Sequence, residues 1–141
     1  MKISCGIIIK LQNTVLLCHP TKASQNNSFS FPKGGVEKKD ETFKDTAIRE
    51  CLEEVGIEIT KNLLSKRFTI DYTKNNTSKI IKRVHLFLAE INSLEQLNLT
   101  SIVIPNSQLQ LSEVDWAGFL TKEQAAPKIF WRFKHLLEEI L

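Results

Sequence analysis

Apolar runs near the start of the chain predict a β-hairpin. Residues 4–10 are mostly β-branched and continuous, as in a buried strand, and residues 15–18 return after a turn at Gln12-Asn13. The polar stretch 19–28 that follows predicts a surface loop.

An aromatic stretch leads from this loop toward a glycine pair. Residues 29–31 predict a short strand, which Pro32 ends. We expect Lys33-Gly34-Gly35 to form a loop, because glycines permit unusual backbone angles and a close approach to a ligand.

The next segment, up to Val55, has the periodicity of a helix. Asp40 or Thr42 can cap its start, and Gly56 is well placed to end it. At about 100° per residue, one half of this helix is apolar and is predicted to face the core. Its members are Phe43, Ala47, Ile48, Cys51, Leu52 and Val55.

The second half of the chain predicts more strands and a terminal helix. Residues 64–72 and 79–90 predict two long strands, and residues 114–119 predict an edge strand. A capping pattern at Thr121 predicts a short helix, and an amphipathic pattern predicts a last helix over 129–140. This order predicts an α/β fold, with a mixed β-sheet flanked by helices.

Length and composition predict one globular domain over residues 1–141. The net charge of +3 is compatible with a polyanionic substrate but too small to indicate a stable nucleic-acid partner. The three cysteines form no C-x-x-C pair, so we expect neither disulfides nor a zinc site. Because no signal pattern or membrane-spanning stretch is present, we expect a cytoplasmic protein without a membrane partner.

Three carboxylates crowd one side of the predicted helix. Glu50, Glu53 and Glu54 stand at i, i+3 and i+4, so their side chains are expected to converge beside the apolar face. Desolvating like charges is unfavourable unless positive charge is supplied. Mg²⁺ suits this set, since it takes carboxylate oxygens, keeps several waters and shares substrate phosphates. The alternative is a solvated acidic face.

The residues around these carboxylates favour the metal interpretation. Residues 35–57 follow the pattern G-x5-E-x7-R-E-u-x-E-E-x-G-u, where u is apolar. This spacing resembles the Nudix box, the signature of the Nudix hydrolases, with Cys51 at an aliphatic position. The resemblance implies a Nudix α/β/α sandwich and hydrolysis of a nucleoside diphosphate linked to another moiety.

The resemblance also implies a role for each acidic residue of the box. It makes Glu50, Glu53 and Glu54 the ligands of Mg²⁺ or Mn²⁺, with a carbonyl of Gly34 or Gly35 completing the coordination. Either Glu50 or Glu53 is then the catalytic base.

Two further features concern the surroundings of the box. Glu41 and Arg49 are expected to pair and to brace the loop against the helix. Glu113 is a second candidate for the base, with an ordinary surface glutamate as the alternative.

Residues 29–37 resemble the W-x-F-P-K-G-x-x-E motif of the dinucleoside tetraphosphate hydrolases, with Phe29 in place of the tryptophan. In this motif Lys33 stands at the edge of the expected metal loop, where a lysine can bind an extended polyphosphate.

A tyrosine and a basic strand beyond the box are similar to the same subgroup. Tyr72 can stack on a nucleobase, and Lys79, Lys82 and Arg83 can meet phosphates. The alternatives are ordinary packing of the tyrosine ring and a solvated strand face.

The substrate favoured by these features is a dinucleoside polyphosphate such as diadenosine tetraphosphate. A MutT-like nucleoside triphosphate pyrophosphatase, an RNA 5′-end pyrophosphohydrolase and a diphosphoinositol polyphosphate phosphatase remain alternatives. A nucleotide-binding Nudix-like module without catalysis is a fifth interpretation. The complete set of Glu50, Glu53 and Glu54 argues against it, since a sensor has no need of all three.

Overall fold

A computed structural model describes all 141 residues. Its strands and α-helices follow in the order β1 (Lys2–Leu11), β2 (Thr14–Pro20), β3 (Lys33–Gly35), α1 (Phe43–Val55), β4 (Leu64–Thr73), β5 (Ile80–Ile91), β6 (Val114–Thr121), α2 (Lys122–Ala125) and α3 (Lys134–Ile140). Short 3₁₀ helices lie at Lys61–Leu63, Leu94–Leu97, Asn106–Gln108 and Trp131–Phe133. The predicted N-terminal hairpin, the box helix and the two long strands are confirmed.

The six strands form one mixed sheet in the order β4-β5-β1-β2-β6, and β3 pairs with β1 off this path. β1 runs parallel to β5, and all other pairs are antiparallel. Different parts of β1 pair with different strands on this edge. Lys10 and Leu11 pair with β2, whereas Ser4 to Gly6 pair with β3. The short β3 therefore lies beside the middle of the sheet.

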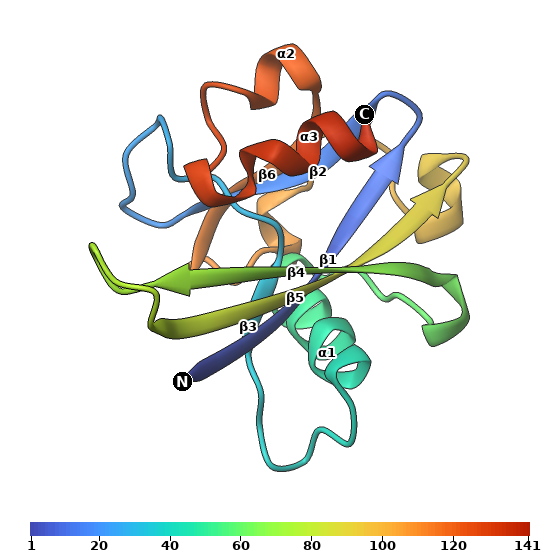
Figure 1. The fold of residues 1–141 in the computed structure, drawn as a ribbon. Helices are drawn as coiled ribbons and strands as arrows, with labels where there is room; N and C mark the ends of the chain where they lie inside the picture. The colour runs from blue at the N-terminus through green and yellow to red at the C-terminus, as the bar shows by residue number, and fades with distance from the viewer.

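Helices cover both faces of this sheet, with α1 on one side and α2 and α3 on the other (Figure 1). Ile7 and Ile9 of β1 belong to the core cluster that includes Cys51 of α1. Ile8, which points the opposite way, belongs to the cluster that includes Leu136 of α3. The predicted mixed sheet flanked by helices is confirmed.

The ends of α1 follow the predicted signals. Thr42 is the N-cap and forms a capping box with Asp45, while Gly56 ends the helix in the left-handed region at φ 67°. α1 has 13 residues, and no helix of the structure combines the length and apolar character needed to cross a membrane.

Three predicted elements are wrong. Residues 29–31, expected as a short strand, form only isolated β-bridges, from Phe29 to Ile129 and from Ser30 to Cys18. Lys33–Gly35, expected as a loop, is strand β3, because its backbone pairs with Ser4 to Gly6 of β1. The last helix, expected over 129–140, is restricted to α3 because the chain before it pairs with Phe29. The Phe29 N–H donates to the Lys128 carbonyl and the Phe130 N–H to the Phe29 carbonyl, each at 2.9 Å.

Candidate active site

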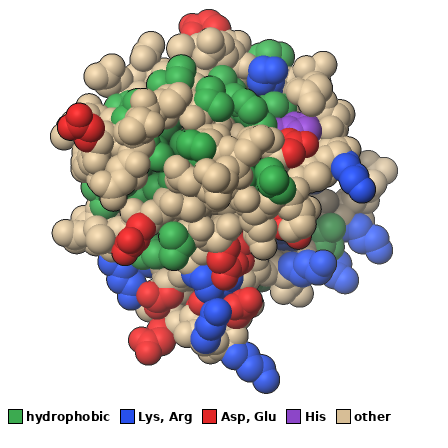
Figure 2. Space-filling model, turned by 180° about the vertical axis from the view of Figure 1, so that it is seen from behind, with side chains coloured by type: hydrophobic (Ala, Val, Ile, Leu, Met, Phe, Trp, Pro, Cys, Tyr) green, Lys and Arg blue, Asp and Glu red, His purple; other side chains and the backbone are tan.

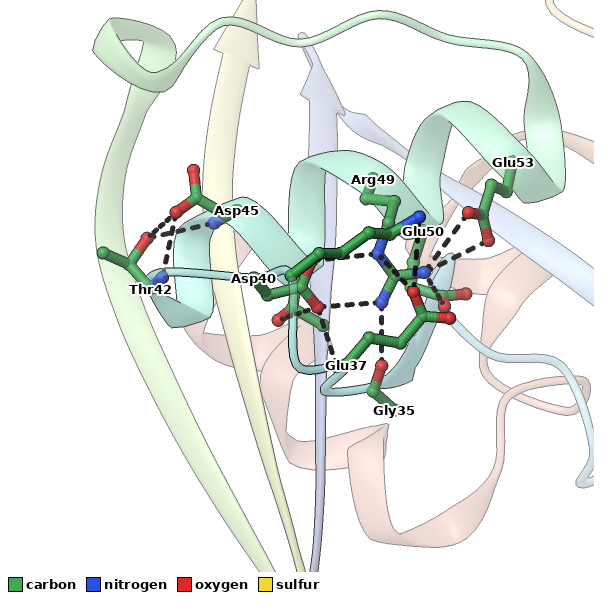
Figure 3. Close-up of polar contacts among 10 residues, drawn as sticks. Gly35, Glu37, Asp40, Thr42, Asp45, Arg49, Glu50 and Glu53 are labelled. Carbon is green, nitrogen blue, oxygen red and sulfur yellow. Dashed lines mark hydrogen bonds and ion pairs between the residues drawn. The ribbon is translucent and has the colours of Figure 1, made fainter.

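Arg49 is the centre of a hydrogen-bond network between α1 and the loop before it (Figure 3). Its guanidinium donates to both carboxylate oxygens of Asp40, at 3.0 and 2.9 Å, and to the Gly35 carbonyl at 2.9 Å. Only 12% of the Arg49 side chain and 4% of the Asp40 side chain are exposed. The hydrogen bonds from Arg49 therefore hold the pKa of Asp40 well below its usual value.

The expected partner of Arg49 was Glu41, and that prediction is wrong. Asp40 and Glu37 close a tight turn, in which the Asp40 N–H donates to the Glu37 carbonyl and the Glu37 N–H donates to the Asp40 carboxylate. This turn points Asp40 toward α1, where it also accepts from the Thr46 hydroxyl at 2.8 Å. Glu41 is left exposed and forms no ion pair. The loop is braced against the helix, but by Asp40.

The three glutamates of the box do not converge as expected. Arg49 Nη1 donates to Glu50 at 2.8 Å and to Glu53 at 3.2 Å, whereas Glu54 Oε1 accepts the Lys33 N–H at 3.2 Å. No group of three His, Cys, Asp or Glu side chains is close enough together to hold a metal ion. The reason is that Arg49 neutralises two of the carboxylates while the third is turned toward β3.

Glu50 lies directly against β3. A Cβ atom added to Gly34 would stand 2.2 Å from Cδ of Glu50, so a side chain at this position would displace the carboxylate. Gly34 is therefore required for the approach of α1 to β3, although it sits in a strand rather than in a loop.

Burial is the main reason why the pKa of Glu54 is raised to about 7. The charges of Glu50 and Glu113 act in the same direction, which places Glu113 near this carboxylate. The donors here are oxygen atoms with a negative net charge, and a divalent cation would favour the ionised form of Glu54 against its burial. By the chemistry of the donor set, the residues present fit Mg²⁺ or Mn²⁺.

Cationic and aromatic side chains gather on the other side of β3. The side chain of Lys33 lies next to Lys82, and burial together with this second positive charge lowers the pKa of Lys33 to about 8. Nζ of Lys82 in turn lies 5.2 Å from the centre of the Tyr72 ring. The structure therefore brings together Lys33, Tyr72 and Lys82, which the sequence proposed separately.

Two other residues of the basic strand are placed elsewhere. Lys79 is exposed in the turn between β4 and β5, and its side chain forms no hydrogen bond or ion pair with these three. Arg83 donates to the Asp71 carboxylate at 2.6 and 3.1 Å, so its charge is already neutralised.

Arg132, which no sequence pattern singled out, also lies in this region. Its guanidinium lies 4.9 Å from the centre of the Tyr72 ring and 4.4 Å from that of Trp131. It donates weakly to the carbonyls of Asp71 and Thr73, at 3.3 and 3.5 Å, and has no carboxylate partner. The only signal in the sequence was its position within the aromatic run Phe130 to Phe133.

A protein-family model described as the NUDIX domain matches residues 2–137. The chain belongs to the Nudix family. The predicted box and the predicted fold are thereby confirmed, and membership of this family supports a pyrophosphohydrolase activity. Nudix hydrolases generally use divalent metal ions, in agreement with the donor chemistry above.

The chain is similar in sequence to a named protein of greater length. The chain is 31% identical over 111 residues to the mRNA-decapping enzyme subunit 2 of Arabidopsis thaliana, a match that covers 79% of this chain and 26% of that protein. The chain thus spans about a quarter of the length of that relative.

Solved structures with the same fold include two further kinds of Nudix enzyme. A C. elegans Ap4A hydrolase in a binary complex is similar with a TM-score of 0.66 and 25% identity, covering 99% of this chain and 94% of that one. A MutT Nudix hydrolase from Burkholderia pseudomallei is similar with a TM-score of 0.68 and 17% identity, covering 99% and 98%. The second likeness shows the fold alone.

Proposed function

We propose that this Nudix hydrolase cleaves dinucleoside polyphosphates, such as diadenosine tetraphosphate, with the help of Mg²⁺. The observation that carries the proposal is the position of β3. The Lys33 N–H bonds Glu54, while the Lys33 side chain lies beside Lys82 and, through it, Tyr72. The carboxylates that can bind a metal therefore lie beside lysines that can bind phosphates and a tyrosine ring that can stack on a nucleobase.

The acidic residues of α1 would hold the metal. Glu50, Glu53 and Glu54 are the proposed ligands, together with a carbonyl of Gly34 or Gly35. A bound Mg²⁺ or Mn²⁺ would neutralise phosphate oxygens and lower the pKa of the attacking water.

The protein groups then complete the reaction. Glu50 or Glu53 takes the proton of a water molecule whose oxygen attacks one phosphorus in line with the bridging oxygen that leaves. Diadenosine tetraphosphate and water would thereby yield AMP and ATP. Lys33 and Lys82 would hold the polyphosphate, and Tyr72 would stack on a base. Lys79, at the exposed turn, would reach only the outer part of a long substrate.

An RNA 5′ end is a second candidate substrate. It is favoured by the 31% identity to the mRNA-decapping enzyme subunit 2, and the unpaired Lys82 and Arg132 suit a polyanion of that kind equally well.

A substrate panel decides between these candidates. With Mg²⁺ present, kcat/KM is compared for diadenosine tetraphosphate, ATP, dGTP and a triphosphorylated RNA. We expect the highest value for diadenosine tetraphosphate, with AMP and ATP as products. A higher value for dGTP or for the RNA would refute the assignment of the substrate. Addition of EDTA should abolish turnover, and calorimetry should detect uptake of Mg²⁺ or Mn²⁺.

A further inference from the structure

A cavity lies outside the acidic and cationic residues described above. It has a volume of about 320 Å³ and is lined by His19, Gln25, Phe29, Asp115, Trp116, Leu120 and Lys128. It opens where the end of β2 and the start of β6 meet the segment before α3. None of the box residues lines it. Its volume is at the lower end of the range for small-molecule sites, enough for one nucleobase with its sugar but not for a dinucleotide.

The apolar part of this cavity is formed by two aromatic rings. Phe29 is buried, and Trp116 meets it edge to face with the ring centres 5.9 Å apart. A Cβ atom on Gly118 would stand 2.6 Å from the Trp116 indole, so the glycine allows that ring to lie close along β6. The half-buried indole provides a flat surface on which a planar group can stack.

His19 holds in place the loop after β2, which forms one wall of the cavity. Its Nδ1 lies 2.5 Å from Asp115 Oδ1, and its Nε2 lies 3.0 Å from the carbonyls of both Ala23 and Ser24. Every neighbour is an acceptor, so both ring nitrogens donate. His19 and Asp115 therefore neutralise each other, and this wall of the cavity is already formed in the absence of a ligand.

The one uncompensated charge of the lining is that of Lys128. Its Nζ lies 5.3 Å from the centre of the Phe29 ring, and it forms no ion pair with any carboxylate. A ligand that fits this cavity therefore combines a planar aromatic group with an anion.

The cavity is joined to the candidate active site by a short piece of chain. Phe29 and Lys33 are four residues apart, which corresponds to about 13 Å in an extended backbone. Phe29 also belongs to the core cluster against which Tyr72 packs, so the cavity and the Tyr72 ring lie on the same side of the sheet. Figure 1 shows the loop after β2 beside the segment that leads to α3, where Lys128 lies.

We propose that this cavity binds the second nucleotide of a dinucleoside polyphosphate, with its base on Trp116 and a phosphate oxygen on Lys128. This rests on the proposed function, because only a substrate with two nucleosides occupies both places.

Kinetics with matched substrates test the proposal. Trp116→Leu and Lys128→Gln are each assayed with diadenosine tetraphosphate and with adenosine 5′-tetraphosphate, which has the same four phosphates but one nucleoside. We expect KM for diadenosine tetraphosphate to rise about 10-fold in each variant, within the 1–3 kcal/mol of a stacked base or of a charged hydrogen bond. The values for adenosine 5′-tetraphosphate should change less than twofold. Lys44→Gln, an exposed position on α1, is the control for loss of a positive charge. Equal effects on both substrates, or none, would overturn the proposal.

A binding measurement separates this proposal from the proposed function. In a Trp131→Phe variant Trp116 is the only tryptophan, and AMP is titrated with EDTA present so that no metal contributes. We expect saturable quenching of its fluorescence, weakened about 10-fold by the additional Lys128→Gln change. Absence of quenching would refute the second site even if diadenosine tetraphosphate is the substrate. Quenching in a protein that does not cleave diadenosine tetraphosphate would refute the proposed function and retain an AMP site.

Discussion

The acidic face of α1 and the cationic cluster around Tyr72 are neighbours, but they are built in different ways. Arg49, Glu50 and Glu53 stand within five residues of one helix, and their contacts follow from its geometry. Lys33 and Tyr72 come from separate strands and Arg132 from a 3₁₀ helix near the end of the chain. The contacts of the first region depend only on residues that are close together in the sequence. The cationic cluster around Tyr72 changes whenever the packing of a strand or of the terminal segment changes. We therefore expect this cluster to determine which substrate is bound.

The distribution of charge on the surface follows this division. Seen from behind, acidic and basic side chains alternate over the lower part of the molecule, around the loop that leads into α1, whereas apolar side chains gather higher up (Figure 2). Several charges of α1 are paired, Arg49 with Glu50, Glu53 and the loop residue Asp40, and Asp45 with Lys61.

The largest expected effect is that of Glu54→Gln on turnover. We predict that kcat falls by at least about 100-fold, because a bound metal contributes several kcal/mol to stabilising charge in the transition state. The melting temperature should stay equal or rise, since burial opposes the charge of Glu54 and an amide oxygen can still accept the Lys33 N–H. Glu95→Gln, at an exposed position, is the control. Wild-type turnover in the Glu54 variant would show that the acidic face of α1 takes no part in catalysis.

The next effect concerns stability and the partner of Arg49. Asp40→Asn should destabilise the fold by about 1.5–3 kcal/mol, the range for hydrogen bonds to charged groups. The adjacent Glu41→Gln should have almost no effect, because Glu41 forms no ion pair. The pKa of Asp40 is lowered in the folded state, so its contribution is present above the unfolded value near pH 4 and is lost as the pH falls toward the folded value. Urea unfolding of both variants at pH 7 and pH 3 measures this. Equal stability of the two variants would contradict the role of Asp40.

Lys33→Gln tests the cationic side. We predict that KM for a polyphosphate substrate rises about 10-fold with little change in kcat, because a charge-assisted hydrogen bond to phosphate contributes about 1.5–3 kcal/mol. Lys79→Gln removes the same charge from the exposed turn and should change KM by less than twofold. If the two variants behave alike, the cluster around Tyr72 has no special part in binding.

The smallest effect is a dependence on pH. Burial and the charge of Lys82 lower the pKa of Lys33 to about 8, so Lys33 loses its proton as the pH rises through that value. We predict that kcat/KM, which reports groups of the free enzyme, falls above about pH 8 in the wild type. This fall should be absent in Lys33→Gln, and its persistence there would assign it to another group.

The sequence by itself determined the box helix and its caps, because Thr42 and Gly56 act on the backbone next to them. It also determined the family, since the fixed residues of 35–57 are a local pattern. It did not determine the side of α1 on which Leu52 lies, and that residue, predicted for the core, is 50% exposed. The sheet reaches only part of the apolar half of the helix.

Only the tertiary structure decided which groups meet. Asp40 rather than Glu41 binds Arg49 because a turn with Glu37 sets its direction. Lys33–Gly35 is a strand because β1 supplies its backbone partners, and the terminal helix is short because Phe29 pairs with the chain before it. These outcomes depend on hydrogen bonds between segments far apart in the chain. A pattern of neighbouring residues contains no information about such partners, and for the same reason the contact of Arg132 with Tyr72 appeared only in the folded molecule.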